Sequence, residues 1–216
     1  VVGSVFVVAG LVLQAATFDP AVVFTILLVL VVIAGSVLPW LALGATRTRV
    51  EQVYSDADIT TDPIPIRAEA VHEDAVLGHE ILLAVTSTVG ALLVLCAPLA
   101  VDLGITGTLI AVAAAGVVML RTRQYRAGSE VLTGLAAGIL GLTSTAGSVL
   151  YLHPSWGPTV AVILASAGAL VLAVTLIPSP PSVRRGRLGD VLELVCLLSL
   201  LPLLVVASGL FEKLRG

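Results

Sequence analysis

The sequence is poor in charged residues. Only 12% of its 216 residues are Asp, Glu, Lys or Arg, whereas 58% are hydrophobic. A soluble domain usually carries about 25% charged residues, so this chain has too little polar surface to cover itself in water. The shortage excludes an ordinary soluble domain and indicates that the bilayer is the solvent. The net charge of −3 and the absence of a basic tract also give no sign of nucleic-acid binding.

Cysteine is scarce as well. Cys96 and Cys196 both lie in apolar runs, with no CxxC spacing and no neighbouring histidine. This pattern excludes a disulfide framework and favours two small buried hydrophobic side chains.

Motifs that carry chemistry are also missing. The sequence contains no HExxH, GxSxG or P-loop motif and no paired carboxylates on one helical face. We therefore predict no catalytic, cofactor-binding or metal-binding residues. The few ionisable residues near apolar runs, such as His79, Glu80, Asp190 and Glu193, are expected to snorkel or to pair with nearby arginines.

Long apolar runs dominate what is present. A spanning helix needs about 20 apolar residues, and lipid forces the backbone to satisfy its own hydrogen bonds. The sequence therefore predicts an all-α, polytopic transmembrane bundle. The seven predicted spans are about 1–17, 21–44, 76–100, 104–120, 131–152, 159–177 and 191–210. The chain begins inside an apolar run without a methionine, so we interpret it as a fragment of a larger protein.

Basic residues gather in alternate connections. Nine of the eleven lie in three predicted loops, and the positive-inside rule places these loops in the cytoplasm. The C-terminus is then expected outside the inner (plasma) membrane. The nine residues are Arg47, Arg49, Arg67, Arg121, Arg123, Arg126, Arg184, Arg185 and Arg187.

The connection over residues 45–75 is longer than two spans need. It is either a solvated connector or a docking surface for a soluble partner, and its length favours docking. The residues predicted to dock partners are Arg47, Arg49, Arg67, Glu69, Glu73, Arg121, Arg123 and Arg126.

Small residues form a second pattern. Gly134, Gly138 and Gly141 lie in the segment GLAAGILG, a GxxxG motif with one further turn. Such residues let helix backbones approach closely in lipid. The predicted packing is either within one protomer or between protomers.

Several segments together resemble a known family. They are residues 63–65 (PIP), 121–126 (RTRQYR), 188–193 (LGDVLE), 200–203 (LLPL) and 209–215 (GLFEKLR). In combination they resemble the C-terminal membrane half of EccD, the multi-span component of the type VII (ESX) secretion system of mycobacteria and related actinobacteria. EccD proteins have a cytoplasmic ubiquitin-like domain followed by eleven spans, so seven spans would be the last seven.

The resemblance implies a non-enzymatic subunit without cofactors. It implies a homodimer with a second EccD protomer that encloses a lipid-holding space. It further implies assembly with the inner-membrane subunits EccB, EccC and EccE, of which EccC hydrolyses ATP. The implied export substrates are small helical proteins of the WxG, PE and PPE types.

A secondary transporter or permease is the alternative function. It would need polar groups that converge near the membrane midplane. The candidates are Gln14, Thr86, Ser87, Thr88, Thr143, Ser144 and Thr145. Serine and threonine in a helix more often bond to carbonyl groups of their own helix, so the secretion subunit is the preferred interpretation.

Overall fold

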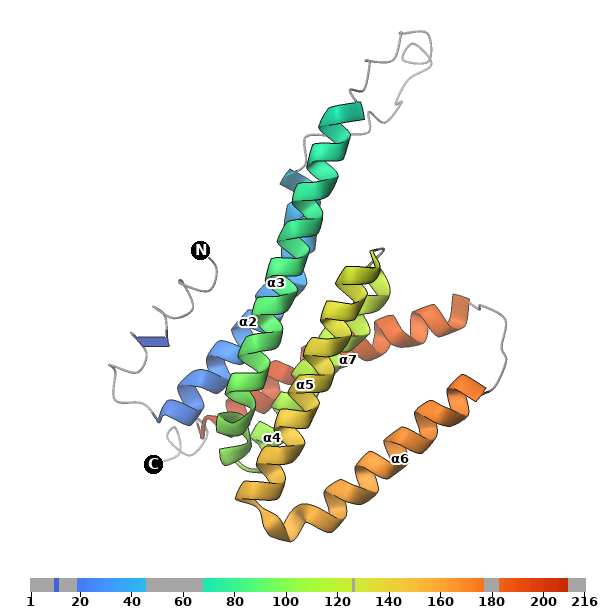
Figure 1. Ribbon diagram of the computed structural model, residues 1–216. Helices are drawn as coiled ribbons and strands as arrows, with labels where there is room; N and C mark the ends of the chain where they lie inside the picture. The colour runs from blue at the N-terminus through green and yellow to red at the C-terminus, as the bar shows by residue number, and fades with distance from the viewer. Residues whose placement is uncertain (1–9, 12–18, 46–67, 126, 177–182, 210–216) are drawn as a thin grey trace.

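The computed structural model describes residues 10–11, 19–45, 68–125, 127–176 and 183–209. Within these ranges all regular structure is helical (Figure 1). The α-helices are α2 (Pro20–Ala45), α3 (Ala68–Asp102), α4 (Ile105–Arg121), α5 (Gly128–Leu152), α6 (Gly157–Leu176) and α7 (Val183–Ala207). Two 3₁₀ turns, η2 (Thr122–Gln124) and η3 (Pro154–Trp156), follow α4 and α5.

Local sequence signals fix several helix ends. Pro20 opens α2, and the Asp19 carboxylate accepts a hydrogen bond of 2.9 Å from the Ala21 amide, which caps the helix. Between α3 and α4 the chain turns through Gly104, whose φ of 81° suits a residue without a Cβ. Gly209, with a φ of 63°, follows α7 in the same way.

Helix α4 is at the centre of the bundle. It contacts α2, α3, α5 and α7. Its buried Ala114 and Ala115 belong to one apolar core with Leu28 of α2, Leu93 of α3 and Leu200 of α7. Because alanine side chains are short, neighbouring helices can approach the α4 backbone closely, and dispersion contacts then hold the bundle together in lipid.

Helix α6 lies apart from this core. It swings away from the end of α5 (Figure 1), and its main contacts are with α5 and η3. Residues 161–169 of α6 are all exposed. Helix α7 also leaves large apolar side chains on its surface, among them Leu188, Leu194 and Leu198. In a bilayer such faces meet lipid or another protein.

Five helices of the described ranges are long and apolar enough to cross a membrane, so the chain is a multi-pass membrane protein. The candidate spans are Pro20–Val37, Val76–Asp102, Ile105–Gln124, Gly128–Leu152 and Gly186–Ala207. The predicted count of seven is not confirmed. Of the first predicted span only residues 10–11 are described, and the sixth corresponds to α6, which is not among the five.

The helices extend beyond the predicted apolar runs at one end. Arg184, Arg185 and Arg187, predicted to lie in a loop, belong to the first turns of α7. Helix α3 likewise begins at Ala68, before the span that starts at Val76. Arginine, alanine and glutamate are good helix formers, so a helix can continue past the hydrocarbon core into the polar layer.

Candidate functional site at the arginine-rich end of the bundle

Helix α4 ends at a buried arginine. Arg121 is 7% exposed, and its Nη2 donates a hydrogen bond of 2.6 Å to the backbone carbonyl oxygen of Ser36 in α2. Removing a guanidinium from water is costly unless hydrogen bonds and opposite charge compensate. The Glu193 carboxylate of α7 supplies part of that compensation by electrostatic attraction. Arg121 therefore connects the end of α4 to two neighbouring helices.

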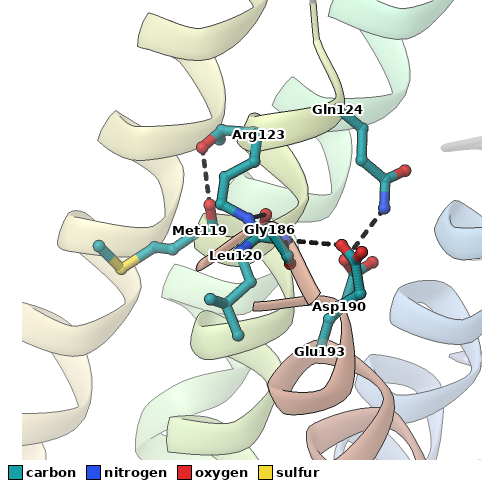
Figure 2. A network of polar contacts seen from close by, with 8 residues as sticks. Met119, Leu120, Arg123, Gln124, Gly186, Asp190 and Glu193 are labelled. Carbon is teal, nitrogen blue, oxygen red and sulfur yellow. Dashed lines mark hydrogen bonds and ion pairs between the residues drawn. The ribbon is translucent and has the colours of Figure 1, made fainter. Parts of the chain in front are cut away.

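Arg123 joins η2 to the start of α7 (Figure 2). Its Nη2 donates to the Asp190 carboxylate at 2.7 Å and to the Gly186 carbonyl oxygen at 3.3 Å. Its Nε donates to the Leu120 carbonyl oxygen at 3.3 Å. The Asp190 side chain is 66% exposed, so this ion pair is a surface pair and contributes little stability by itself. The contacts of Arg123 instead position α7 against α4, because this one side chain donates hydrogen bonds to three oxygen atoms.

Glu193 is the buried carboxylate of the network. It is 7% exposed, and the Gln124 amide donates to its Oε2 at 3.1 Å (Figure 2). Its charge interacts with Arg121 and Arg123. Of the two carboxylates at the start of the last span, Asp190 thus pairs directly with Arg123, whereas Glu193 bonds to Gln124 and attracts the arginines from a greater distance.

A second polar cluster ties α3 to α5. Glu130, in the first turn of α5, is 7% exposed, and its Oε1 lies 2.7 Å from His79 Nδ1. The other ring nitrogen of His79 lies 3.4 Å from Ser129 Oγ. The Tyr125 and Thr86 hydroxyls are 3.2 Å apart and join η2 to α3. His79 was expected to snorkel or to pair with arginines, so its partner Glu130 was not predicted. The two residues lie 51 positions apart and neither belongs to a motif.

The model of a protein family described as EccD-like transmembrane domain matches residues 1–216. The chain belongs to this EccD-like family. No curated protein matches it. The residues that carried the resemblance in the sequence include Arg121, Arg123, Asp190 and Glu193, which the structure brings together.

The EccD-like fold is shared with a solved structure described as protomer 1 of the ESX-3 core complex. The two superpose with a TM-score of 0.60 at 18% sequence identity. The match covers 91% of this chain and 46% of the other. The chain therefore spans less than half the length of that relative, and the likeness at this identity concerns the fold.

The structure describes part of the predicted docking set. Arg121 and Arg123 lie in the polar network. The residues Arg47, Arg49, Arg67 and Arg126 lie outside the described residues, and so do the side chains of Glu69 and Glu73, whose backbone belongs to α3. Arg121 is buried and donates a hydrogen bond to the Ser36 carbonyl oxygen of the same chain. Arg123, by contrast, is exposed.

The three glycines of the GxxxG pattern all lie at contacts inside the chain. A Cβ at Gly134 would meet the Thr122 side chain, and one at Gly138 would meet Met119 of α4. A Cβ at Gly141 would meet Leu93 of α3. These three glycines of the EccD-like chain thus lie where α5 packs closely against α3, α4 and η2.

Three of the hydroxyl groups proposed for a permease pathway bond to the backbone of their own helices. The Thr88, Thr143 and Thr145 hydroxyls donate to the carbonyl oxygens four residues earlier in their own helices. Ser144 donates to the Val94 carbonyl oxygen of α3. Gln14 lies outside the described residues. Among the described residues, no group of three or more His, Cys, Asp or Glu side chains could hold a metal ion.

Gly189 lies directly against the guanidinium of Arg123. A Cβ at Gly189 would meet the Arg123 guanidinium, whereas a Cβ at Gly186, one turn earlier, meets nothing. Gly186→Ala should therefore raise stability by about 0.5–1 kcal/mol through helix propensity. Gly189→Ala should lose that gain because the Arg123 guanidinium must shift away from its two acceptors on α7.

Thermal unfolding of both variants in the same detergent measures this difference. We expect a higher midpoint for Gly186→Ala than for Gly189→Ala. Equal midpoints would mean that the Arg123 contact with α7 does not contribute.

Proposed function

We propose that this chain is the membrane-embedded part of a non-enzymatic subunit of a type VII secretion complex. The complex would export small helical proteins of the WxG, PE and PPE types, and the subunit would act as scaffold and conduit lining. The single observation that carries the proposal is the match of the EccD-like family model to residues 1–216. The fold shared with a protomer of the ESX-3 core complex supports it.

We propose seven spans for the chain in the inner membrane, with the region 45–75 as a cytoplasmic loop. Helix α6 has 20 residues without a charge, which supports a sixth span. The arginines of the described residues all lie at the end where α4 stops and α7 starts. Asp102 and His153 lie at the other end, where His153 Nε2 approaches the Val101 carbonyl oxygen at 3.4 Å. The positive-inside rule then places the arginine-rich end in the cytoplasm and the C-terminus outside.

The proposed partners are EccB, the ATPase EccC, EccE and a second EccD protomer, with membrane lipid between them. The exposed apolar surfaces of α6 and α7 are the described faces best suited to partners within the bilayer. On the cytoplasmic side, the loop 45–75 and the exposed Arg123 would face soluble domains. The polar network would hold that end of α4 and α7 in a fixed arrangement.

Affinity purification of the full-length protein in mild detergent tests this function. We expect a multi-domain ATPase and two further membrane subunits to co-purify in fixed ratio, identified by mass spectrometry. A lone chain or a simple homodimer, in a detergent that preserves such complexes, would contradict the proposal and favour a permease.

Photo-crosslinking then tests the docking side. A crosslinking residue at Arg49 or Arg67 should capture partner subunits. The matched control is Tyr151, which is 84% exposed at the opposite end of the bundle. Capture of only lipid from positions 49 and 67, or the same proteins from position 151, would overturn the assignment of docking to the arginine-rich end.

A further inference from the structure

A cavity lies between α2, α3 and α4 beside Arg121. It measures about 30 Å³ and is partly open to the outside. A water molecule needs about 10–15 Å³ on this measure, so the cavity has room for about two water-sized groups. It lies entirely within one chain and is separate from the contacts of Arg123 with α7.

The polar groups that line the cavity are hydrogen-bond donors. They are the Arg121 guanidinium and the Tyr125 and Thr86 hydroxyls. A guanidinium has five N–H donors and no acceptor, and one bond, to the Ser36 carbonyl oxygen, is present for Arg121. The bond between Tyr125 and Thr86 uses one hydroxyl hydrogen, so the other is left to donate. These donors suit the oxygen atoms of an anion.

The charge of Arg121 is only partly balanced. Ion pairs within 4.0 Å in the described residues join His79 to Glu130 and Arg123 to Asp190, and Arg121 takes part in neither. Glu193 attracts it from a greater distance and is itself shared with Arg123. A cation that is 7% exposed with this partial compensation favours a further anionic partner.

The remaining walls of the cavity are apolar. Val32, Val85, Val89, Val117 and Val118 are among the lining residues. Ile81 also lines it and is 45% exposed, so the mouth opens beside an apolar surface of α3. Arg121 and Tyr125 line the cavity at the end of the candidate span Ile105–Gln124, where a spanning helix reaches the layer of lipid phosphate groups. A soluble anion would make no favourable contact with the apolar surface at the mouth, whereas a lipid would place its acyl carbons against it.

We propose that this cavity binds the phosphate oxygens of one anionic phospholipid. Arg121 supplies the charge, the Tyr125 and Thr86 hydroxyls supply a directed donor, and the apolar surface of α3 at the mouth, beside Ile81, receives the start of an acyl chain. The bound lipid would fill the space between α2, α3 and α4 and stabilise their packing. Inorganic phosphate shares the recognised chemistry and is distinguished by experiment.

Ligand-dependent unfolding of the full-length protein provides the test. The delipidated protein is titrated in detergent with phosphatidylglycerol, phosphatidylcholine or inorganic phosphate, and the unfolding midpoint is recorded. We expect a saturable rise with phosphatidylglycerol, a weaker one with phosphatidylcholine and none with phosphate at equal concentration. Native mass spectrometry should show one tightly retained lipid per chain.

Tyr125→Phe is the decisive variant because it removes a hydroxyl and leaves Arg121 in place. The half-saturating concentration of phosphatidylglycerol should rise about tenfold, the usual effect of one hydrogen bond to a charged group. Tyr151→Phe, at the exposed opposite end, is the matched control and should bind as the native protein does. Arg121→Gln should abolish the saturable response, and if this variant does not fold, the result with Tyr125→Phe still decides.

Each other outcome counts against the proposal. An equal effect of inorganic phosphate would keep a phosphate site but overturn the lipid as its occupant. Indistinguishable titrations of Tyr125→Phe and Tyr151→Phe, or no saturable response to any probe, would overturn the site itself.

Discussion

Replacing Gly90 with alanine should destabilise the bundle by about 1–3 kcal/mol, the usual cost of overpacking a close contact. Gly90 lies in α3 and faces Ala137 of α5, and a Cβ on Gly90 would meet the Ala137 Cβ and come within 3.3 Å of its Cα. Both of these atoms are rigidly attached to a helix backbone. The added methyl group therefore has to push α3 and α5 apart, and these two helices form the most extensive pair in the bundle.

An exchange of the two residues tests this explanation. Ala137→Gly alone should cost about 1 kcal/mol, because glycine is a poor helix former. The double variant Gly90→Ala/Ala137→Gly still has one alanine and one glycine at the contact, with their positions exchanged. It should therefore be more stable than either single variant. This non-additivity is the signature of direct contact.

The matched control on the same helix is Gly78→Ala. A Cβ at Gly78 meets nothing within 4 Å, so this variant should be neutral or stabilised by up to about 1 kcal/mol. Unfolding midpoints of the four variants, measured in one detergent, give the comparison. A double variant as unstable as the sum of the two single changes would show that α3 and α5 do not meet at Gly90.

The helical membrane architecture could be predicted because lipid leaves the chain few choices. A sequence with 12% charged residues and apolar runs of spanning length has to form helices in a bilayer. The neighbours of each helix could not be predicted. The runs are apolar on all sides, so no stripe marks the face that meets another helix.

The same limit applies to the site. The GLAAGILG segment drew attention to Gly134, Gly138 and Gly141, but Gly90 has no GxxxG motif around it, although its contact with Ala137 is as close. Asp190 could be assigned to the arginines because both lie at the predicted ends of spans. Glu130 could not be paired with His79, because only the parallel packing of α3 and α5 brings them together.

Breaking the pair between His79 and Glu130 should have the other large effect. In His79→Leu the Glu130 carboxylate, which is 7% exposed, loses the ring nitrogen at 2.7 Å. A buried carboxylate without its partner costs about 3–5 kcal/mol in a fully enclosed site. Because the His79 side chain is 35% exposed, water can reach part of the site, and we expect a loss of about 2–3 kcal/mol.

Two further variants separate loss of the pair from loss of packing. His79→Leu/Glu130→Leu removes the charge as well as its partner, so it should recover much of the stability, since an apolar pair often replaces a buried polar pair without loss. Asp190→Asn, which breaks the exposed pair with Arg123, should cost at most about 1 kcal/mol. If His79→Leu is no less stable than Asp190→Asn, the carboxylate of Glu130 is reached by water and the pair does not hold α3 to α5. A clear difference would instead identify this pair, and not the arginine network, as the main polar link between the helices at the arginine-rich end of the bundle.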